Sequence, residues 1–167
     1  MCVGTLKNVC MNKYSGPAIP SDANVLYQIA CGLNYIHSKN VLHSRIKPTN
    51  ISISLSDPLL IKVSNVGSSK STGYKELVNV ETQILKIIDI DSTENWRAPE
   101  CLQLVKRASG KHSMKSDIFS CGLVFFYFVT RGTHPFGNFL QEKYFNVSMN
   151  IKLNQPVNFK REFLAPI

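Results

Sequence analysis

The stretch VLHSRIKPTN, residues 41–50, joins two segments of different periodicity. Before it, apolar residues recur at helical spacing, and after it they alternate with a period of two. The spacing is that of a catalytic loop at four positions: His43, Lys47, Pro48 and Asn50. Arg45, however, stands where that chemistry would use an aspartate. The sequence therefore raises the question of whether this loop has lost its acid.

A helix is predicted before the loop. It begins at Ser21-Asp22, because such side chains cap the free N–H groups of a first turn, and it ends near Asn40, a residue that tolerates the left-handed conformation. Segments 51–55 and 59–63 flank a Ser-Asp-Pro turn and predict a short β-hairpin. One face of the helix is apolar and is formed by Val25, Leu26, Ile29, Leu33 and Ile36.

The rest of the chain alternates polar loops with apolar segments. Residues 64–95 are polar, apart from the patch 84–90, which is predicted to form a short strand or helix. CLQLV, residues 101–105, predicts the start of a short helix. The apolar segment 116–130 predicts a buried core helix, because it is well short of the ~20 residues that span a membrane. From residue 139 the chain begins as a helix and has no clear cap at its end.

Composition indicates one globular domain of 167 residues with a formal net charge of +8. The cations are scattered and accompany no nucleic-acid motif, so a solvated basic surface is favoured over a nucleic-acid-binding module. Five cysteines, an odd number, argue against a disulfide framework. The positions of two cysteines and three histidines in the sequence predict whether their side chains are buried. Cys31 and Cys121 are expected in the core, and His37, His112 and His134 on the surface or at helix caps.

Four motifs in order give the chain a family resemblance. The kinase sequence H-R-D-L-K-P-x-N falls on 43–50, D-F-G on 65–67, A-P-E on 98–100, and D-x-F/W-S-x-G on 117–122. The chain thus resembles the C-terminal lobe of a eukaryotic protein kinase. Over residues 3–145 it is most similar to the inositol-requiring stress-sensor kinase/endoribonuclease of the unfolded protein response, with ribonuclease L as a relative.

The resemblance implies a mainly α protein-kinase-like fold with a short β-hairpin. It implies a partial C-lobe over residues 1–167, with the catalytic loop at 41–50 and the activation segment at 65–100. No G-x-G-x-x-G loop and no V-A-I-K lysine occur in the sequence. We therefore expect a C-lobe only, with the N-lobe and any ribonuclease domain absent from this chain.

In a kinase, the residues at the positions of Arg45 and Asn65 are the catalytic and the metal-binding aspartates. Lys47 is kept as a charge near the transferred phosphate, and Asn50 as a neutral oxygen ligand. Both replacements make the site more positive, so Mg²⁺ is expected to bind poorly, whereas ATP remains a possible ligand. Fold positions are kept: the resemblance implies that His43 packs under the loop and that Asp117 anchors its backbone.

These features favour a catalytically impaired kinase-like domain, or pseudokinase, that acts by binding or allostery. The expected partners are another protein or a second copy of the lobe. A fragment of a stress-sensor kinase/endoribonuclease-like protein is the preferred origin, located in the cytosol or, if anchored, on the cytosolic face of the endoplasmic reticulum. The alternative is an ATP-dependent Ser/Thr protein kinase whose N-lobe lies outside this chain.

Overall fold

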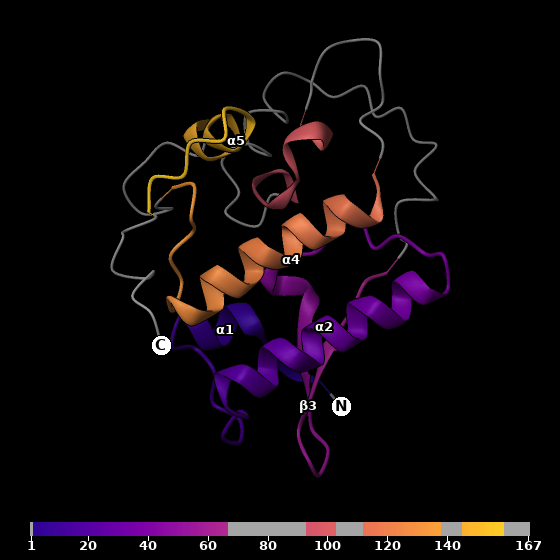
Figure 1. The fold of residues 1–167 in the computed structure, drawn as a ribbon. Coiled ribbons are helices and arrows are strands. Elements are labelled where there is room, and N and C mark those ends of the chain that lie inside the picture. The colour runs from indigo at the N-terminus through magenta and orange to yellow at the C-terminus, as the bar shows by residue number, and fades with distance from the viewer. Residues whose placement is uncertain (1, 67–92, 103–111, 138–144, 159–167) are drawn as a thin grey trace, which may run out of the picture.

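A computed structural model describes residues 2–66, 93–102, 112–137 and 145–158 of the chain (Figure 1). The N-terminal part holds a small sheet and the helix α2, and the C-terminal part holds α4 and α5. The elements in chain order are β1 (Cys2–Thr5), α1 (Leu6–Cys10), α2 (Asp22–Ser38), η1 (Pro48–Asn50), β2 (Ile51–Ser54), β3 (Leu60–Val63), η3 (Thr93–Trp96), η4 (Pro99–Cys101), α4 (Met114–Val129) and α5 (Phe145–Lys152).

Helix α2 begins and ends where the sequence predicted. The Ser21 side chain caps it by accepting a hydrogen bond from the Asn24 amide, and Asn40 has the left-handed φ of 54°. Its buried residues are Val25, Ile29 and Leu33. The prediction that Cys31 is a core residue is wrong, because Cys31 is exposed. At 100° per residue, position 31 lies 200° around the helix from Ile29 and faces away from the core.

The predicted hairpin is confirmed as β2 and β3, which pair antiparallel with Ile53 opposite Ile61. Strand β1 adds a third strand in the order β1-β2-β3, which the sequence did not predict because its four residues show no alternation. Helix α2 covers this sheet at β3. The Gln28 Oε1 atom accepts a hydrogen bond of 2.8 Å from the Ile61 amide. A Cβ atom on Gly32 would lie only 3.1 Å from Val63 Cγ2, so the helix and the strand approach closely here.

Helix α4 is the predicted apolar core helix. Ser113 and Ser116 form a capping box at its start, and eight of its residues are buried. It runs antiparallel to α2 (Figure 1), and side-chain contacts join the two helices at both ends. At one end His37 Nε2 lies 3.0 Å from Asp117 Oδ2, and at the other Arg131 donates to both carboxylate oxygens of Asp22 at 2.9 Å.

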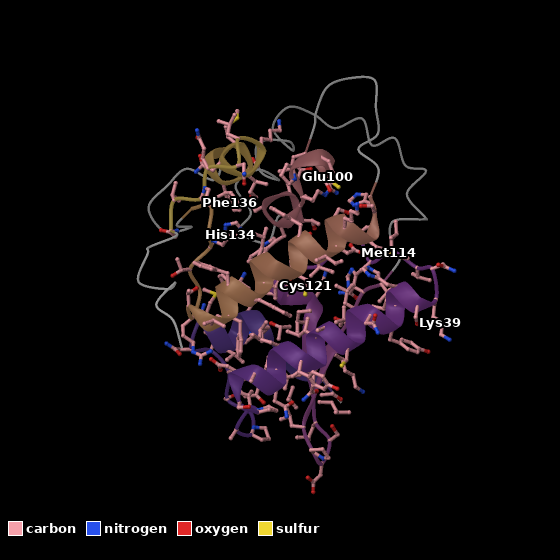
Figure 2. All side chains as sticks on the ribbon, in the orientation of Figure 1. Lys39, Glu100, Met114, Cys121, His134 and Phe136 are labelled. Atoms are coloured by element: carbon pink, nitrogen blue, oxygen red, sulfur yellow. The ribbon has the colours of Figure 1, made fainter. Side chains whose placement is uncertain are left out.

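A second packing layer joins α4 to η3 and α5. The Trp96 ring meets Tyr127 edge-on, with centroids 5.4 Å apart, and His134 likewise at 4.8 Å. Val147 and Ile151 are fully buried on α5. The expectation that His134 is a surface or capping residue is wrong: it has no exposed area and lies with Phe136 between α4 and α5 (Figure 2). The aromatic neighbours exclude water from it.

Three of the predicted segments lie largely outside the described residues. This holds for the patch 84–90, for most of CLQLV, and for the beginning of the helix predicted from residue 139. Of CLQLV, only Cys101 and Leu102 are described, at the end of η4 and just after it. Among the helices that are described, none is both long and apolar enough to cross a bilayer.

The burial of His134 predicts acid sensitivity. Burial lowers the pKa of His134 to about 3, against a smaller opposing effect of the Asn95 backbone. Since the unfolded chain has an ordinary histidine pKa of ~6.5, the unfolded state binds a proton first as the pH falls. From pH 7 to pH 5 the free energy of unfolding should fall by about 2 kcal/mol through His134 alone.

Denaturant titrations at pH 7, 6 and 5 measure the slope of the free energy of unfolding against pH. In His134→Gln the slope between pH 7 and 5 should become shallower, whatever the variant's absolute stability. Burial also lowers the pKa of His43, which acts in the same direction, so part of the slope should remain. An unchanged slope in His134→Gln would contradict the assignment.

Candidate functional site

Asp117, at the start of α4, anchors the backbone of the loop 41–50 through hydrogen bonds. Its carboxylate is 2% exposed and accepts hydrogen bonds of 2.8 Å from the amides of His43 and Ser44. His37 contributes a third contact at 3.0 Å. Ser44 has a φ of 63°, a conformation uncommon for residues other than glycine, and the carboxylate stabilises it. The predicted anchoring role of Asp117 is confirmed.

His43 is a packing residue of the loop, as predicted. It is fully buried, its Nε2 atom lies 2.9 Å from the Ser64 carbonyl oxygen, and its Nδ1 atom accepts from the Arg45 amide at 3.3 Å. Burial lowers its pKa, so the ring is neutral at pH 7 and carries its proton on Nε2. With both nitrogens engaged inside the protein, this ring is unsuited to acid–base chemistry on a ligand.

Every polar group of Asn50 is used within the chain. Its side-chain Nδ2 donates to the Arg45 carbonyl oxygen at 2.7 Å, and its amide donates to the Lys47 carbonyl oxygen at 2.9 Å. Its own carbonyl oxygen accepts from both the amide and the hydroxyl of Ser64 at 2.9 Å. Its side-chain Oδ1 accepts from Asn65 Nδ2 at 2.9 Å. The amide plane of Asn50 is therefore fixed from all sides.

Asn65 lies directly after β3 and faces Asn50. It has a left-handed φ of 62°, which asparagine tolerates better than most residues, and it is exposed. The end of β3 is tied to the loop because Ser64 bonds to His43, to Asn50 and to Ser52. Thus the structure brings the side chains of Asn50 and Asn65 together, although they are fifteen positions apart.

This pair of amides is a poor fit for a divalent cation. Mg²⁺ prefers carboxylate oxygens and a near-octahedral set of ligands. Here the Oδ1 atom of Asn50 already accepts a hydrogen bond from Asn65 Nδ2, so this oxygen is engaged within the chain. Elsewhere in the described ranges, too, no three His, Cys, Asp or Glu side chains are grouped as a metal site would require.

Arg45 and Lys47 are both half-buried within the loop. Arg45 joins the pair of amides through its backbone, since its carbonyl oxygen is the acceptor for Asn50. Lys47 precedes the short helix η1 with an extended backbone, φ −163°, and Pro48 follows it at the first helical position. The roles of these two side chains toward a phosphate stay predictions.

Only the ends of the predicted activation segment are described. Asn65 and Val66 begin it, and residues 93–100 close it as η3 and the start of η4. Ala98 is buried, Pro99 begins η4, and Glu100 is exposed. Gly67, the last residue of the segment matched to D-F-G, lies outside the described residues. The residues that position Asn65, chiefly Ser64 and Ser52, were not predicted, because a serine after an alternating strand is also ordinary loop composition.

Taken together, the anchored loop, the hairpin that ends beside it and the apolar helix beneath it define a protein kinase domain. The family model described as "Protein kinase domain" matches residues 4–165, and the chain belongs to this family.

Within the family, the chain is similar to stress-sensor kinase/endoribonucleases. It is 30% identical over 131 residues to the serine/threonine-protein kinase/endoribonuclease IRE1 of Oryza sativa subsp. japonica (78% of this chain, 13% of that protein). It is 37% identical over 116 residues to IRE2 of Homo sapiens, named a kinase/endoribonuclease of the same kind (70% and 12%). A protein of Arabidopsis thaliana named "Inactive serine/threonine-protein kinase/endoribonuclease IRE1-like" is 29% identical over 152 residues (89% and 26%). The chain therefore spans about an eighth to a quarter of the length of these relatives.

Proposed function

We propose that this chain is the C-lobe of a catalytically impaired kinase-like domain that acts by binding or allostery. In this proposal 41–50 is a former catalytic loop and 65–100 the activation segment. The observation that carries the proposal is the hydrogen bond from Asn65 to Asn50, next to Arg45 at the position of the catalytic aspartate. The amide contact stands where an active kinase holds a cation between an asparagine and an aspartate, and Arg45 stands where it needs a second acidic group.

Electrostatics support the same conclusion. Replacing an aspartate with Arg45 shifts the local charge by two units, and replacing another with Asn65 shifts it by one. A pair of unit charges 4 Å apart is worth on the order of 4 kcal/mol at an effective dielectric near 20. Loss of a general base alone costs about 10²–10⁴-fold in rate. The anionic phosphates of ATP, by contrast, are attracted by Arg45 and Lys47, so nucleotide binding without metal is part of the proposal.

A nucleotide titration tests the site. With a fluorescent ATP analogue, the affinity of the chain should be the same in Mg²⁺ and in EDTA. In Asn65→Asp a carboxylate replaces the N–H donor, so Mg²⁺ should raise the affinity by about tenfold, which corresponds to 1.4 kcal/mol. Asn65→Ala is the control, because it removes the amide contact and supplies no carboxylate.

Phosphotransfer decides between this proposal and the alternative, a Ser/Thr protein kinase whose N-lobe lies outside this chain. Lys47 and Asn50 are retained, and the rice relative is named a kinase, which favours the alternative. The relative named inactive favours impairment. Labelled phosphate incorporated by a longer protein that includes an N-lobe, and lost in Lys47→Ala, would establish the alternative. If nucleotide binds in neither buffer, ATP is removed from the proposal, and only the role in binding a protein partner remains.

The proposal extends to origin and location. Similarity to kinase/endoribonucleases supports a fragment of a stress-sensor-like protein whose kinase domain works in the cytosol or at the cytosolic face of the endoplasmic reticulum. A protein partner, or a second copy of the lobe, would then receive the signal. Fractionation of source cells with an antibody to this chain measures both the size of the whole protein and its compartment.

A further inference from the structure

The small sheet has a polar face on the side opposite to α2. Residues that stand opposite each other in an antiparallel pair point to the same face, so the register assigns the residues of the three strands to two faces. Ile53 and Ile61 are buried on the inner face, where Gly32 of α2 approaches Val63. The other face, called the outer sheet face, is formed by Cys2, Thr5, Ser52, Ser54, Leu60 and Lys62.

Hydrogen bonds connect the outer sheet face to the loop 41–50. The Ser64 hydroxyl donates to the Asn50 carbonyl oxygen at 2.9 Å, and the same hydroxyl oxygen lies 2.9 Å from Ser52 Oγ. Asn50 in turn donates to the backbone carbonyl oxygens of Arg45 and Lys47. The outer sheet face therefore adjoins the part of the loop that carries both cations.

This junction offers hydrogen-bond acceptors to a ligand. A hydroxyl group has one hydrogen to donate and two lone pairs that accept. Because the hydroxyl hydrogen of Ser64 is used on Asn50, Ser52 donates its own hydrogen to Ser64, and the lone pairs of Ser52 remain as acceptors. Asn65 likewise uses an N–H on Asn50, and it is exposed at the end of β3. Among the described residues, no group donates to Ser52 Oγ or to Asn65 Oδ1.

The outer sheet face is unsuited to holding a flat aromatic base. Proteins hold such bases by stacking on aromatic side chains and by apolar walls. Of the six residues of this face, Leu60 is the single large apolar one, and it lies opposite Ser54, at the end of β2 away from the loop. Lys62 lies opposite Ser52 and adds a third positive charge to the face. Sugar hydroxyls and phosphates fit such a surface better than a base does.

We propose that this site binds a pentose phosphate through its sugar and phosphate groups and leaves any attached base unrecognised. The phosphates contact the cations of the loop 41–50, and the sugar hydroxyls donate to Ser52 and Asn65. This role rests on the proposed function, because the phosphates use the cations to which that function assigns a nucleotide. It adds which part of the ligand is recognised, a part that either a nucleotide or a free sugar phosphate supplies.

Calorimetric titrations of the full chain in EDTA test the proposal with ATP, GTP, CTP and 2′,3′-dideoxy-ATP. The first three ligands should bind with affinities within about threefold of one another, because the base makes no contact. Dideoxy-ATP has the same base and phosphates as ATP but lacks both ribose hydroxyls. It should bind about tenfold more weakly, because two hydrogen bonds to the protein are lost.

Ser52→Ala tests which residue receives the sugar. It removes one of the two acceptors and leaves Ser64 bonded to Asn50. The difference between ATP and dideoxy-ATP should shrink to about threefold, while the affinity for dideoxy-ATP stays unchanged. Ser54→Ala is the matched control, because Ser54 lies on the same strand and face, two residues further from the loop, and it should keep the full difference. Circular dichroism confirms that both variants are folded.

Two results would overturn the proposal and leave the proposed function standing: a preference of about tenfold or more for one base, or equal binding of ATP and dideoxy-ATP. If none of the nucleotides binds, nucleotide binding itself fails and the sugar subsite fails with it, so the two failures are distinguishable. Ribose 5-phosphate, titrated alongside, separates the two sources of a pentose phosphate. Binding as tight as that of ATP supports a free sugar phosphate, and weaker binding supports a nucleotide.

Discussion

Asp117→Ala should lower the free energy of unfolding by about 3–5 kcal/mol, because the substitution removes a buried carboxylate that satisfies three donors. Without it the amides of His43 and Ser44 lose their acceptors, and the strained φ of Ser44 loses its support. Such a loss is a large fraction of the 5–15 kcal/mol that is typical of a folded domain. Urea denaturation followed by tryptophan fluorescence measures the change.

The matched control for this prediction is Asp22→Asn. Asp22, like Asp117, lies in the first turn of its helix and accepts from a basic side chain, but the pair it forms with Arg131 is exposed. The control should cost no more than about 1 kcal/mol. If Asp117→Ala fails to fold, Asp117→Asn is the second variant, and faster hydrogen exchange at the His43 and Ser44 amides is the readout. Equal losses in Asp117→Ala and Asp22→Asn would contradict the anchoring role.

Trp96→Ala is the second large effect. Trp96 is buried between Tyr127 and His134, and truncation of a buried tryptophan costs about 3–5 kcal/mol. A second consequence follows from the same contact. Water admitted beside His134 should raise the pKa of that histidine toward its ordinary value, so the loss of stability between pH 7 and pH 5 should become smaller.

Thermal unfolding of Trp96→Ala at pH 7 and at pH 5, followed by circular dichroism, measures both effects. Tyr35→Ala is the control, because it removes an aromatic ring that is 65% exposed and should change the free energy of unfolding by no more than about 0.5 kcal/mol. A Trp96→Ala protein with the unaltered pH slope would show that the ring does not shield His134.

The parts of the structure that were predictable depend on local rules. The limits of α2 follow from Ser21 and Asn40, residue types with a known preference for helix ends, and the β-hairpin follows from alternation around a turn. The anchoring of the loop by Asp117 came from the family resemblance, since nothing in local sequence links residues more than seventy positions apart. The family assignment likewise depended on the order of four motifs and not on any one of them.

The parts that were missed depend on contacts across the chain. His134 stands in a short polar-looking segment, and its burial is caused by Trp96 and by α5, which no local pattern reveals. Cys31 was misplaced because residue type was given more weight than its angle on the helix. The hydrogen bond between Asn50 and Asn65 was also not predicted. Their separate matches to metal ligands suggested a weakened cation site, whereas the two amides bond directly to each other.

The dependence of the loop on Asp117 has a consequence for biosynthesis. A ribosome that has just completed residues 41–50 must add more than sixty further residues before Asp117 has been made. At about 5–20 residues per second, and with the delay of the exit tunnel, this takes on the order of ten seconds. During that interval the His43 and Ser44 amides have no Asp117 carboxylate to accept their hydrogen bonds. In nascent chains that end before α4, these two amides are left to water, so protection of the His43 and Ser44 amides from hydrogen exchange should appear only in chains that include α4.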